Sequence, residues 1–294
     1  MPAKFRIGKL AVIGVGLIGG SFAMALRKAR AVGRVVGMGR TRRNLATALR
    51  LGIIDEIAVD AVTAVRDADF VLLGVPVGQM PEVMARIAPH VSRHAVISDA
   101  GSTKQDVIAS AQRFLKDSLS RFVPAHPVAG TEMSGAGAAF ATLYRGRNVI
   151  LTPQAETSRA AVATVRRAWE ACGARVVRLR PDEHDAIFAA VSHLPHVVAF
   201  ALVGALARRR NARKLFAFSA GGLRDTARIA GSSPEMWRDI CISNRDALLE
   251  VLDAYMEELE RARGAIAAAD AATLEHMFEV ARAARARWLV PRKS

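Results

Sequence analysis

The chain has 294 residues, of which 51% are hydrophobic, and this is enough to fill one large core or two smaller ones. Its formal net charge is +15, but only 5% of its residues are aromatic, so few rings are available to stack on bases. We therefore assign the positive charge first to solvated helix faces and second to a polyanionic substrate, and we expect no nucleic-acid partner.

The N-terminal apolar run continues into a glycine motif instead of a cleavage site, and no apolar stretch looks long enough to cross a bilayer. Cys172 and Cys241 are the only cysteines, and they lie far apart in helical patterns. This usage predicts reduced thiols rather than a disulfide or a metal site. We expect a cytoplasmic protein with no membrane partner.

From residue 8 to about residue 180, short β-branched runs alternate with amphipathic stretches of helical length. This alternation is typical of an α/β fold with a mostly parallel sheet covered by helices on both faces. The expected strands are Lys9–Ile13, Arg34–Met38, Ala68–Gly74, Ala95–Asp99, Arg121–Ala125, Arg147–Leu151 and Arg175–Leu179. The expected helices are Leu17–Arg30, Gly78–Ala88, Ser102–Leu115 and Ser158–Cys172.

A glycine motif lies between the first expected strand and the first expected helix. Gly14 would form the tight turn, Gly16 would let the backbone approach a pyrophosphate, and Gly19 would let the helix pack on the strand. The backbone at Leu17 and Ile18 would offer free N–H groups at the start of the helix. The motif in this position predicts a Rossmann-type, doubly wound dinucleotide-binding domain over residues 1–180.

The second expected strand indicates which dinucleotide is bound. An NAD site usually carries an acidic residue at the end of this strand, but here the chain continues as Gly39, Arg40 and Thr41. Arg40 and Thr41 could bind a 2′-phosphate, so we expect NADP, with NAD possible. Alternatively, the arginines at 40–43 only begin the next helix. Val75 and Pro76 end a later strand, where they would line the cofactor crevice or simply form a turn.

After Pro181 the strand signals stop, and the pattern predicts an all-helical second domain over residues 181–294. Its apolar stretches, such as Val197–Leu206 and Ala247–Leu252, exceed what one small domain needs. We therefore expect this domain to form a homodimer.

Four further clusters are not required by the fold. They are residues 98–104 (SDAGSTK), 126–132 (HPVAGTE), 192–196 (SHLPH) and 221–228 (GGLRDTAR), the last followed by residues 237–239 (WRD). In this order and spacing, together with the glycine motif, they resemble the prephenate/arogenate dehydrogenases of tyrosine biosynthesis, also called cyclohexadienyl dehydrogenases. The resemblance covers nearly the whole chain.

The resemblance implies oxidative decarboxylation of prephenate to 4-hydroxyphenylpyruvate, of arogenate to tyrosine, or of both. His126 matches the family's catalytic histidine, and a neutral imidazole suits removal of the hydroxyl proton. Ser102 matches the serine that hydrogen-bonds the reacting hydroxyl. Ser102 could equally be a helix N-cap, and the two roles are compatible. The chemistry needs no metal, and we expect none.

The resemblance also implies the residues that bind a dicarboxylate substrate. Arg228 matches the family's carboxylate-binding arginine, and His196 is a substrate-contact candidate. Gly221 and Arg224 belong to the same cluster as Arg228, although Arg224 could be a solvated surface charge. Trp237 matches an aromatic residue near the pocket, but it could be plain core.

Two other functions fit the glycine motif. An NADP-dependent β-hydroxyacid dehydrogenase or reductase would share both domains, but such enzymes generally use a lysine where this chain has histidine and arginine clusters. A non-catalytic dinucleotide-binding regulator would bind the cofactor without turnover, and it would leave His126, Ser102 and Arg228 unexplained.

Overall fold

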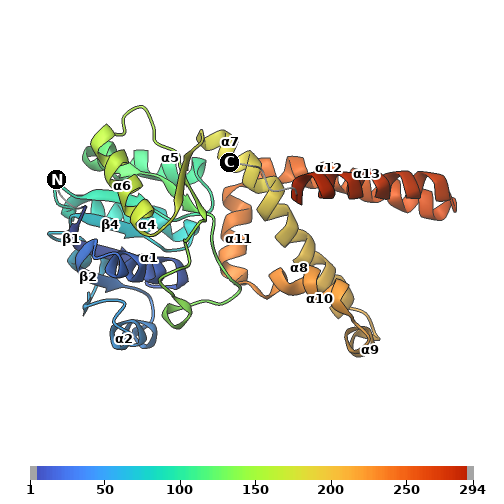
Figure 1. Cartoon of the computed structure of the whole chain (residues 1–294), viewed down its shortest axis with the longest axis horizontal. Helices are drawn as coiled ribbons and strands as arrows, with labels where there is room; N and C mark the ends of the chain where they lie inside the picture. Colours follow the sequence, from blue (N-terminus) through green and yellow to red (C-terminus); the bar gives the residue numbers. More distant parts are fainter. Residues whose placement is uncertain (1–4, 290–294) are drawn as a thin grey trace. The chain divides into compact units, whose positions relative to one another are not determined.

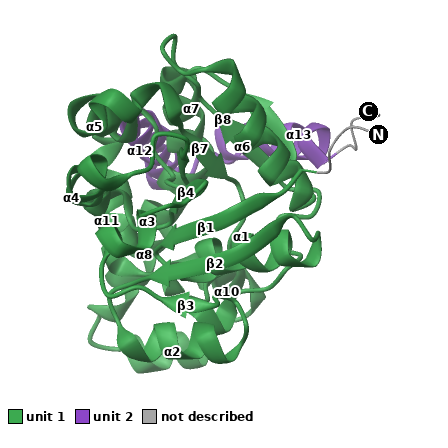
Figure 2. Cartoon of the chain, turned by 90° about the vertical axis from the view of Figure 1, so that its left-hand side faces the viewer, with its two compact units in different colours: residues 1–245 green, residues 246–294 purple. Residues whose placement is uncertain are grey.

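The computed structural model describes residues 5–289, and the chain forms two compact units. Unit 1 is residues 1–245 and unit 2 is residues 246–294 (Figure 2).

Unit 1 contains a six-stranded parallel sheet with strand order β3-β2-β1-β4-β5-β6. Strands β1, β2 and β4 of this sheet are labelled in Figure 1. The strands are β1 (Ile7–Ile13), β2 (Val32–Met38), β3 (Glu56–Ile57), β4 (Phe70–Leu73), β5 (Val96–Asp99) and β6 (Phe122–Val123). The order reverses between β1 and β4, and ligands of doubly wound sheets bind beyond the carboxyl ends of the strands at such a reversal. Ile13 pairs there with Met38 on one side and Leu73 on the other. The expected Rossmann-type fold is confirmed, and the short strand β3 was not predicted.

A second, three-stranded sheet follows, with order β7-β8-β9. Its strands are β7 (Ala125–Pro127), β8 (Asn148–Leu151) and β9 (Arg175–Arg178), with β7 antiparallel to β8 and β9 parallel to β8. The prediction of one strand over Arg121–Ala125 was therefore wrong. Pro124, which has no N–H to donate to a strand ladder, separates β6 in the first sheet from β7 in the second.

Helices cover both faces of the large sheet. They are α1 (Leu17–Lys28), α2 (Arg42–Arg50), α3 (Ala61–Val65), α4 (Met80–Ile87), α5 (Gln105–Phe114) and α6 (Arg159–Ala171). Short 3₁₀ segments join them at Val77–Gln79 (η1), Ala88–His90 (η2), Lys116–Arg121 (η3) and Ala136–Ala138 (η4). One hydrophobic core holds buried residues of α1, α2 and α6, and the other holds buried residues of α3, α4 and α5.

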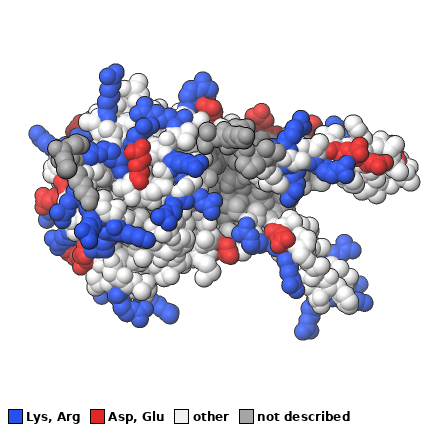
Figure 3. Space-filling view, viewed as in Figure 1, with Lys and Arg blue, Asp and Glu red and all other residues white. Residues whose placement is uncertain are grey.

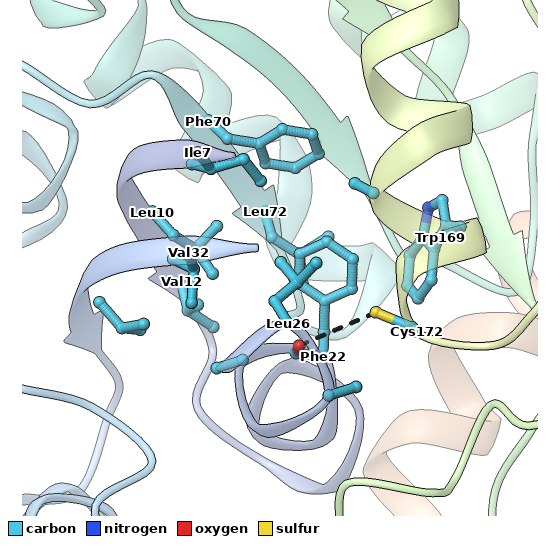
Figure 4. Packing of buried hydrophobic residues seen from close by; sticks show 14 of the residues in the cluster. Ile7, Leu10, Val12, Phe22, Leu26, Val32, Phe70, Leu72, Trp169 and Cys172 are labelled. Carbon is cyan, nitrogen blue, oxygen red and sulfur yellow. Dashed lines mark hydrogen bonds between the residues drawn. The ribbon is translucent and has the colours of Figure 1, made fainter. Parts of the chain in front are cut away.

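The first core is built around aromatic rings (Figure 4). The Phe22 ring centroid lies 4.5 Å from that of Trp169 and 5.8 Å from that of Phe70. Cys172 is a buried free thiol beside the Phe22 carbonyl, and burial raises its pKa. The cysteine is therefore a packing residue, as expected for a reduced thiol. Cys241 is also free, but it is only half-buried.

The remainder of unit 1 is helical. It contains α7 (Pro181–Phe188), a π-helical segment η5 (Ala189–His193), α8 (Leu194–Ala207), α9 (Ala212–Ala217), α10 (Gly221–Ala227), the 3₁₀ segment η6 (Arg228–Gly231) and α11 (Pro234–Ser243). The π segment ends two residues before Pro195, whose ring and missing N–H disturb a regular helical turn, and such π segments are common at functional sites. Trp237 and Ile240 of α11 pack into the second core of the large sheet. This part of the helical region is thus fixed against the nucleotide-binding region.

One continuous helix runs from Pro181 to Ala207, and its 27 residues are long and apolar enough to span a membrane by length and composition. The expectation that the chain has no such stretch was therefore wrong. The signal is weak by itself, because the same helix carries the buried polar side chains of His184, Asp185 and His193. Positive side chains are spread over the visible face instead of gathering in one patch (Figure 3).

Unit 2 consists of the long helix α12 (Arg245–Ala267), which starts at the last residue of unit 1, and α13 (Ala271–Leu289). Within the described residues, α13 has no buried side chain. Phe278 and Trp288 are 64% and 79% exposed. The apolar side chains of this helix are thus available to a partner surface.

Candidate active site

The glycine loop between β1 and α1 has the geometry of a pyrophosphate cradle. Gly14 has a φ of +100°, and a Cβ there would lie 2.5 Å from the backbone of Gly74. A Cβ on Gly19 would lie 2.4 Å from the Gly14 carbonyl oxygen, whereas a Cβ on Gly16 would meet nothing within 4 Å. Gly14 and Gly19 are therefore required for packing, and the space over Gly16 is open to a ligand.

The start of α1 suits an anion. Leu17 and Ile18 are its first two residues, and its first turn contains no acidic side chain. The N–H groups of a first helical turn lack partners within the helix and carry partial positive charge. The residues present therefore fit the pyrophosphate of a dinucleotide.

Two side chains that the sequence did not single out hold this loop. Asn44 of α2 donates from Nδ2 to the Val15 carbonyl (2.6 Å) and accepts from the Ala136 N–H (2.7 Å). The buried Tyr144 hydroxyl donates to the Ile18 carbonyl (2.6 Å). An asparagine within a helix and a buried tyrosine carry no local signal, so only the fold reveals these contacts.

Beyond β2, the candidate phosphate-binding residues lie opposite a carboxylate. Arg40 is in the loop after the strand, and Thr41 is the N-cap residue of α2, although its side chain makes no capping bond. The Arg40 guanidinium donates to both carboxylate oxygens of Glu235 on α11, at 2.6 and 2.9 Å. Gln79 donates to the same carboxylate (3.2 Å). The hydrogen bonds between Arg40 and Glu235 raise the pKa of the guanidinium and lower that of the carboxyl.

Val75 and Pro76 connect β4 to η1, and both are half-buried. Gly74, immediately before them, is the residue whose backbone approaches Gly14. These residues therefore lie beside the glycine loop at the carboxyl edge of the sheet.

Ser102 lies in the loop between β5 and α5, not at the start of the helix. The helix begins at Gln105 with Lys104 as its N-cap residue, so the alternative role of Ser102 as N-cap was wrong. Asp185 of α7 performs the capping, because its carboxylate accepts from the backbone N–H of Lys104 (2.8 Å) and of Gln105 (2.9 Å). Ser102 itself is half-buried.

His126 lies on β7 and is 8% exposed. Its Nδ1 lies 2.8 Å from Nε2 of His184, and Nδ1 of His184 lies 2.8 Å from Oδ1 of Asp185. Phe188 packs its ring against both histidines, with centroids 4.5 Å from each. Burial lowers the pKa of His126 well below its ordinary value, and the nearby His184 and Lys104 lower it further. His126 is therefore a neutral, oriented imidazole at neutral pH.

A buried ion pair holds the start of β7. Lys104 and Asp99 are fully buried and form this pair, and the ammonium also donates to the Ala125 carbonyl (3.0 Å). Asp99 accepts in turn from the N–H of Ala125 (3.0 Å) and of Gly101 (2.8 Å). The backbone on the N-terminal side of His126 is thus bound to the loop that carries Ser102.

His196 and Trp237 form a second aromatic group. Their rings are stacked with centroids 3.5 Å apart, and His193 meets Trp237 edge to face at 6.1 Å. The His193 Nε2 and the Trp237 Nε1 are buried and have no hydrogen-bond partner within residues 5–289. Asn244 contacts both the Asp185 carbonyl and His193 Nδ1, at 2.8 and 3.0 Å, and so connects this group to the first.

Arg228 lies on η6, and its guanidinium is 3.4 Å from the Glu132 carboxylate, with both side chains largely exposed. Burial lowers the pKa of His196, and the charge of Arg228 lowers it further, so the two side chains are electrostatic neighbours. Gly221 is the first residue of α10 and is exposed. Arg224, on the same helix, lines a surface cavity of about 270 Å³ together with apolar side chains of α8, α9 and α10.

The structure thus brings two of the predicted groups together, with His126 in one and His196, Trp237 and Arg228 in the other. Three residues outside the predicted site join them: His184, Asp185 and Asn244. His184 showed no ligand spacing in the sequence, and only the packing of α7 against β7 and α5 brings it to His126.

Two family models match the chain. The model for the nucleotide-binding domain of prephenate dehydrogenase matches residues 22–178, and the model for its dimerization domain matches residues 180–280. Among curated proteins, a cyclohexadienyl dehydrogenase of Zymomonas mobilis is 40% identical over 281 residues, which cover 94% of each chain. A prephenate dehydrogenase of Bacillus subtilis is 37% identical over 92% of this chain and 73% of its own.

A solved structure is similar over the whole length. The chain matches a prephenate dehydrogenase from A. aeolicus, crystallised with hydroxyphenyl propionate and NAD+, with a TM-score of 0.86 and 34% identity. The match covers 97% of this chain and 99% of that chain. On its sequence and its fold, this chain belongs to the prephenate dehydrogenase family.

Proposed function

We propose that the protein is an NAD(P)-dependent dehydrogenase that oxidatively decarboxylates prephenate to 4-hydroxyphenylpyruvate, arogenate to tyrosine, or both. The observation that carries the proposal is the buried, neutral His126 beside the loop that carries Ser102, in a chain that belongs to this family. The names of the relatives, prephenate and cyclohexadienyl dehydrogenase, support the substrate class.

In this proposal His126 is the base. Its imidazole accepts the proton of the substrate hydroxyl, and Ser102 donates a hydrogen bond to the same oxygen. The bound nicotinamide supplies the acceptor for the hydride that leaves the carbon bearing the hydroxyl. The electron pair of the broken ring–carboxylate bond enters the ring and ends on the ring oxygen, which takes a proton back to give the aromatic phenol as carbon dioxide leaves.

Arg228 and His196 are the proposed substrate-binding residues, with Trp237, Arg224 and Gly221 lining the site. Arg228 supplies a planar guanidinium for one carboxylate, and substrate would compete there with Glu132. The buried Trp237 Nε1, which has no partner within residues 5–289, supports a further hydrogen bond to a ligand.

For the cofactor, we propose binding through Gly14, Gly16, Leu17, Ile18 and Gly19, with Val75 and Pro76 beside the crevice. We further propose a preference for NADP, with Arg40 and Thr41 as the 2′-phosphate contacts. Both terminal nitrogens of Arg40 now donate to the Glu235 carboxylate, so a 2′-phosphate would compete with this carboxylate for the guanidinium. The relative from A. aeolicus was crystallised with NAD+, so NAD is the alternative for this site.

We propose that the chain works as a cytoplasmic homodimer through its helical part, residues 181–294, with residues 1–180 as the dinucleotide-binding domain. The match to a dimerization-domain model and the exposed apolar side chains of α13 support this assembly.

The first test is a two-by-two assay of the purified protein with prephenate or arogenate and with NAD or NADP, following reduced cofactor by absorbance. Turnover in any combination supports the reaction and identifies both specificities. Cofactor binding without turnover in all four would contradict the proposed function.

A further inference from the structure

The hydrogen bonds around His126 fix the direction in which each group donates. Asp185 accepts two backbone N–H groups of the α5 terminus, at 2.8 and 2.9 Å. Burial opposes ionisation of this carboxyl, but the hydrogen bonds from His184, Gln105 and Lys104 outweigh it and lower its pKa. Asp185 is therefore an ionised carboxylate at neutral pH, and an ionised carboxylate can only accept.

The ionised Asp185 then determines which nitrogen of each neighbouring histidine carries a proton. Nδ1 of His184 lies 2.8 Å from Asp185 Oδ1 and must donate to it. Burial lowers the pKa of His184, and the bond to Asp185 offsets only part of this, so the ring is neutral and its Nε2 carries a lone pair. Nδ1 of His126, 2.8 Å from that lone pair, must carry the proton. Nε2 of His126 is then left without a proton and can act as a base.

We propose that His184 and Asp185 are positioning residues for His126, which hold it as the Nδ1–H tautomer with Nε2 free to accept the substrate proton. This inference rests on the proposed function, because it takes His126 as the base. When His126 gains the proton, its positively charged ring still donates to His184. The His184 ring then lies between this charge and the Asp185 carboxylate. The arrangement does for this base what a buried aspartate does for the histidine of a serine protease.

The surroundings make the alignment rigid. Lys104 connects Asp185 to the strand of His126. Its backbone N–H donates to the Asp185 carboxylate, and its ammonium donates to the carbonyl of the residue before His126. Phe188 packs against both rings edge-on or tilted, which opposes their rotation. Asp185 thus caps α5 and also orients His184.

Two variants at His184 separate an orienting role from a merely structural one. His184→Gln retains an acceptor at the position of Nε2, whereas His184→Phe fills the space with a ring that cannot accept. We expect kcat of His184→Gln to stay within about tenfold of the wild type and that of His184→Phe to fall about 10²- to 10³-fold, with cofactor Kd unchanged in both. His90→Gln, at an exposed histidine of η2, is the matched control and should behave as the wild type.

The tautomer is read directly by ¹⁵N-edited NMR of the imidazole signals, assigned with His126→Asn. We expect the Nδ1–H form of His126 in the wild type and in His184→Gln, and the Nε2–H form in His184→Phe. An Nε2–H signal for His126 in the wild type would overturn the inference, whether or not His184→Phe folds. Equal kcat in the two folded variants would overturn it as well. If the wild type shows no turnover, the proposed function is contradicted instead. The NMR result would still test the tautomer of His126 independently.

Discussion

His126 combines two properties that a base needs at the residue scale: it is neutral and it is held in place. Replacement by asparagine preserves much of the side-chain volume but removes the nitrogen that would accept the proton. We expect His126→Asn to lower kcat by about 10²- to 10⁴-fold, the usual range for loss of a general base, with little change in cofactor Kd. Steady-state kinetics and fluorescence titration with the reduced cofactor measure both quantities. Turnover near the wild-type rate would exclude His126 as the base.

The pH dependence of the reaction follows from the same ring. Burial and the neighbouring His184, Lys104 and His193 lower the pKa of His126 below 6.5, so the ring stays neutral as the pH falls through that value. We expect the acidic limb of the kcat/KM profile to lie below pH 6.5, because activity is lost only where His126 gains a proton. Circular dichroism at each pH separates this limb from unfolding. A limb centred at or above pH 6.5 in the folded protein would contradict the assignment.

The Arg40–Glu235 pair gives the prediction on cofactor choice. Glu235→Gln removes the charge that holds the guanidinium, and we expect NADP Kd to fall by about three- to tenfold while NAD Kd changes little. Arg40→Asp should shift the preference away from NADP. Calorimetric titration of both cofactors checks this, with Glu183→Gln, an exposed carboxylate of α7, as control. An unchanged NADP Kd in both Glu235→Gln and Arg40→Asp would mean that other residues bind the 2′-phosphate.

At the scale of elements, the Lys104–Asp99 pair joins the α5 loop to β7. Lys104→Met leaves a fully buried carboxylate without its counter-charge, which typically costs 3–5 kcal/mol of folding free energy. We expect a loss of about that size in urea unfolding, together with reduced activity because β7 carries His126. Lys28→Met, at the exposed end of α1, should cost no more than about 1 kcal/mol. A small effect at Lys104 would mean that water reaches Asp99.

The elements differ in how far the sequence could predict them. Strands β1, β2, β4 and β5 and the helices α1 and α6 were predicted because their apolar runs are local and strongly periodic. The division at Pro124 was missed, since the run from Arg121 to Ala125 reads as one strand, and only pairing with β8 shows that β7 belongs to another sheet. The glycine turn was confirmed for a local reason, because the φ of Gly14 is a property of its own residue.

The candidate site was predictable only where a residue type carries the chemistry. His126, Arg228 and the glycine loop were identified from the sequence, and their roles stay predictions. His184, Asp185, Asn44 and Asn244 were not assigned to the site, because their contacts join segments that lie 29 to 92 residues apart. The carboxylate opposite Arg40 was missed for the same reason, being 195 residues away.

For the whole molecule, the exposed apolar side chains of α13 predict assembly. Phe278, Val280 and Trp288 are each more than half exposed in one chain, and burying them requires a partner surface. We expect sedimentation at micromolar concentration to give twice the mass of one chain. Phe278→Asp should weaken the dimer, whereas the exposed Glu279→Gln in the same helix should not. A monomeric wild type would contradict the proposed homodimer.

The capping of α5 by Asp185 also has a consequence for folding. The turn at Gly14 forms within its own segment, although Asn44 and Tyr144 also hold the glycine loop, whereas α5 receives its cap from a residue that leaves the ribosome about 80 residues later. The strand of His126 likewise waits for β8. Contacts between residues so far apart in the sequence form late in folding, because the chain must first close a long loop. We therefore expect refolding molecules to gain turnover only after these long-range contacts have formed, so that the reactive part of the site assembles late.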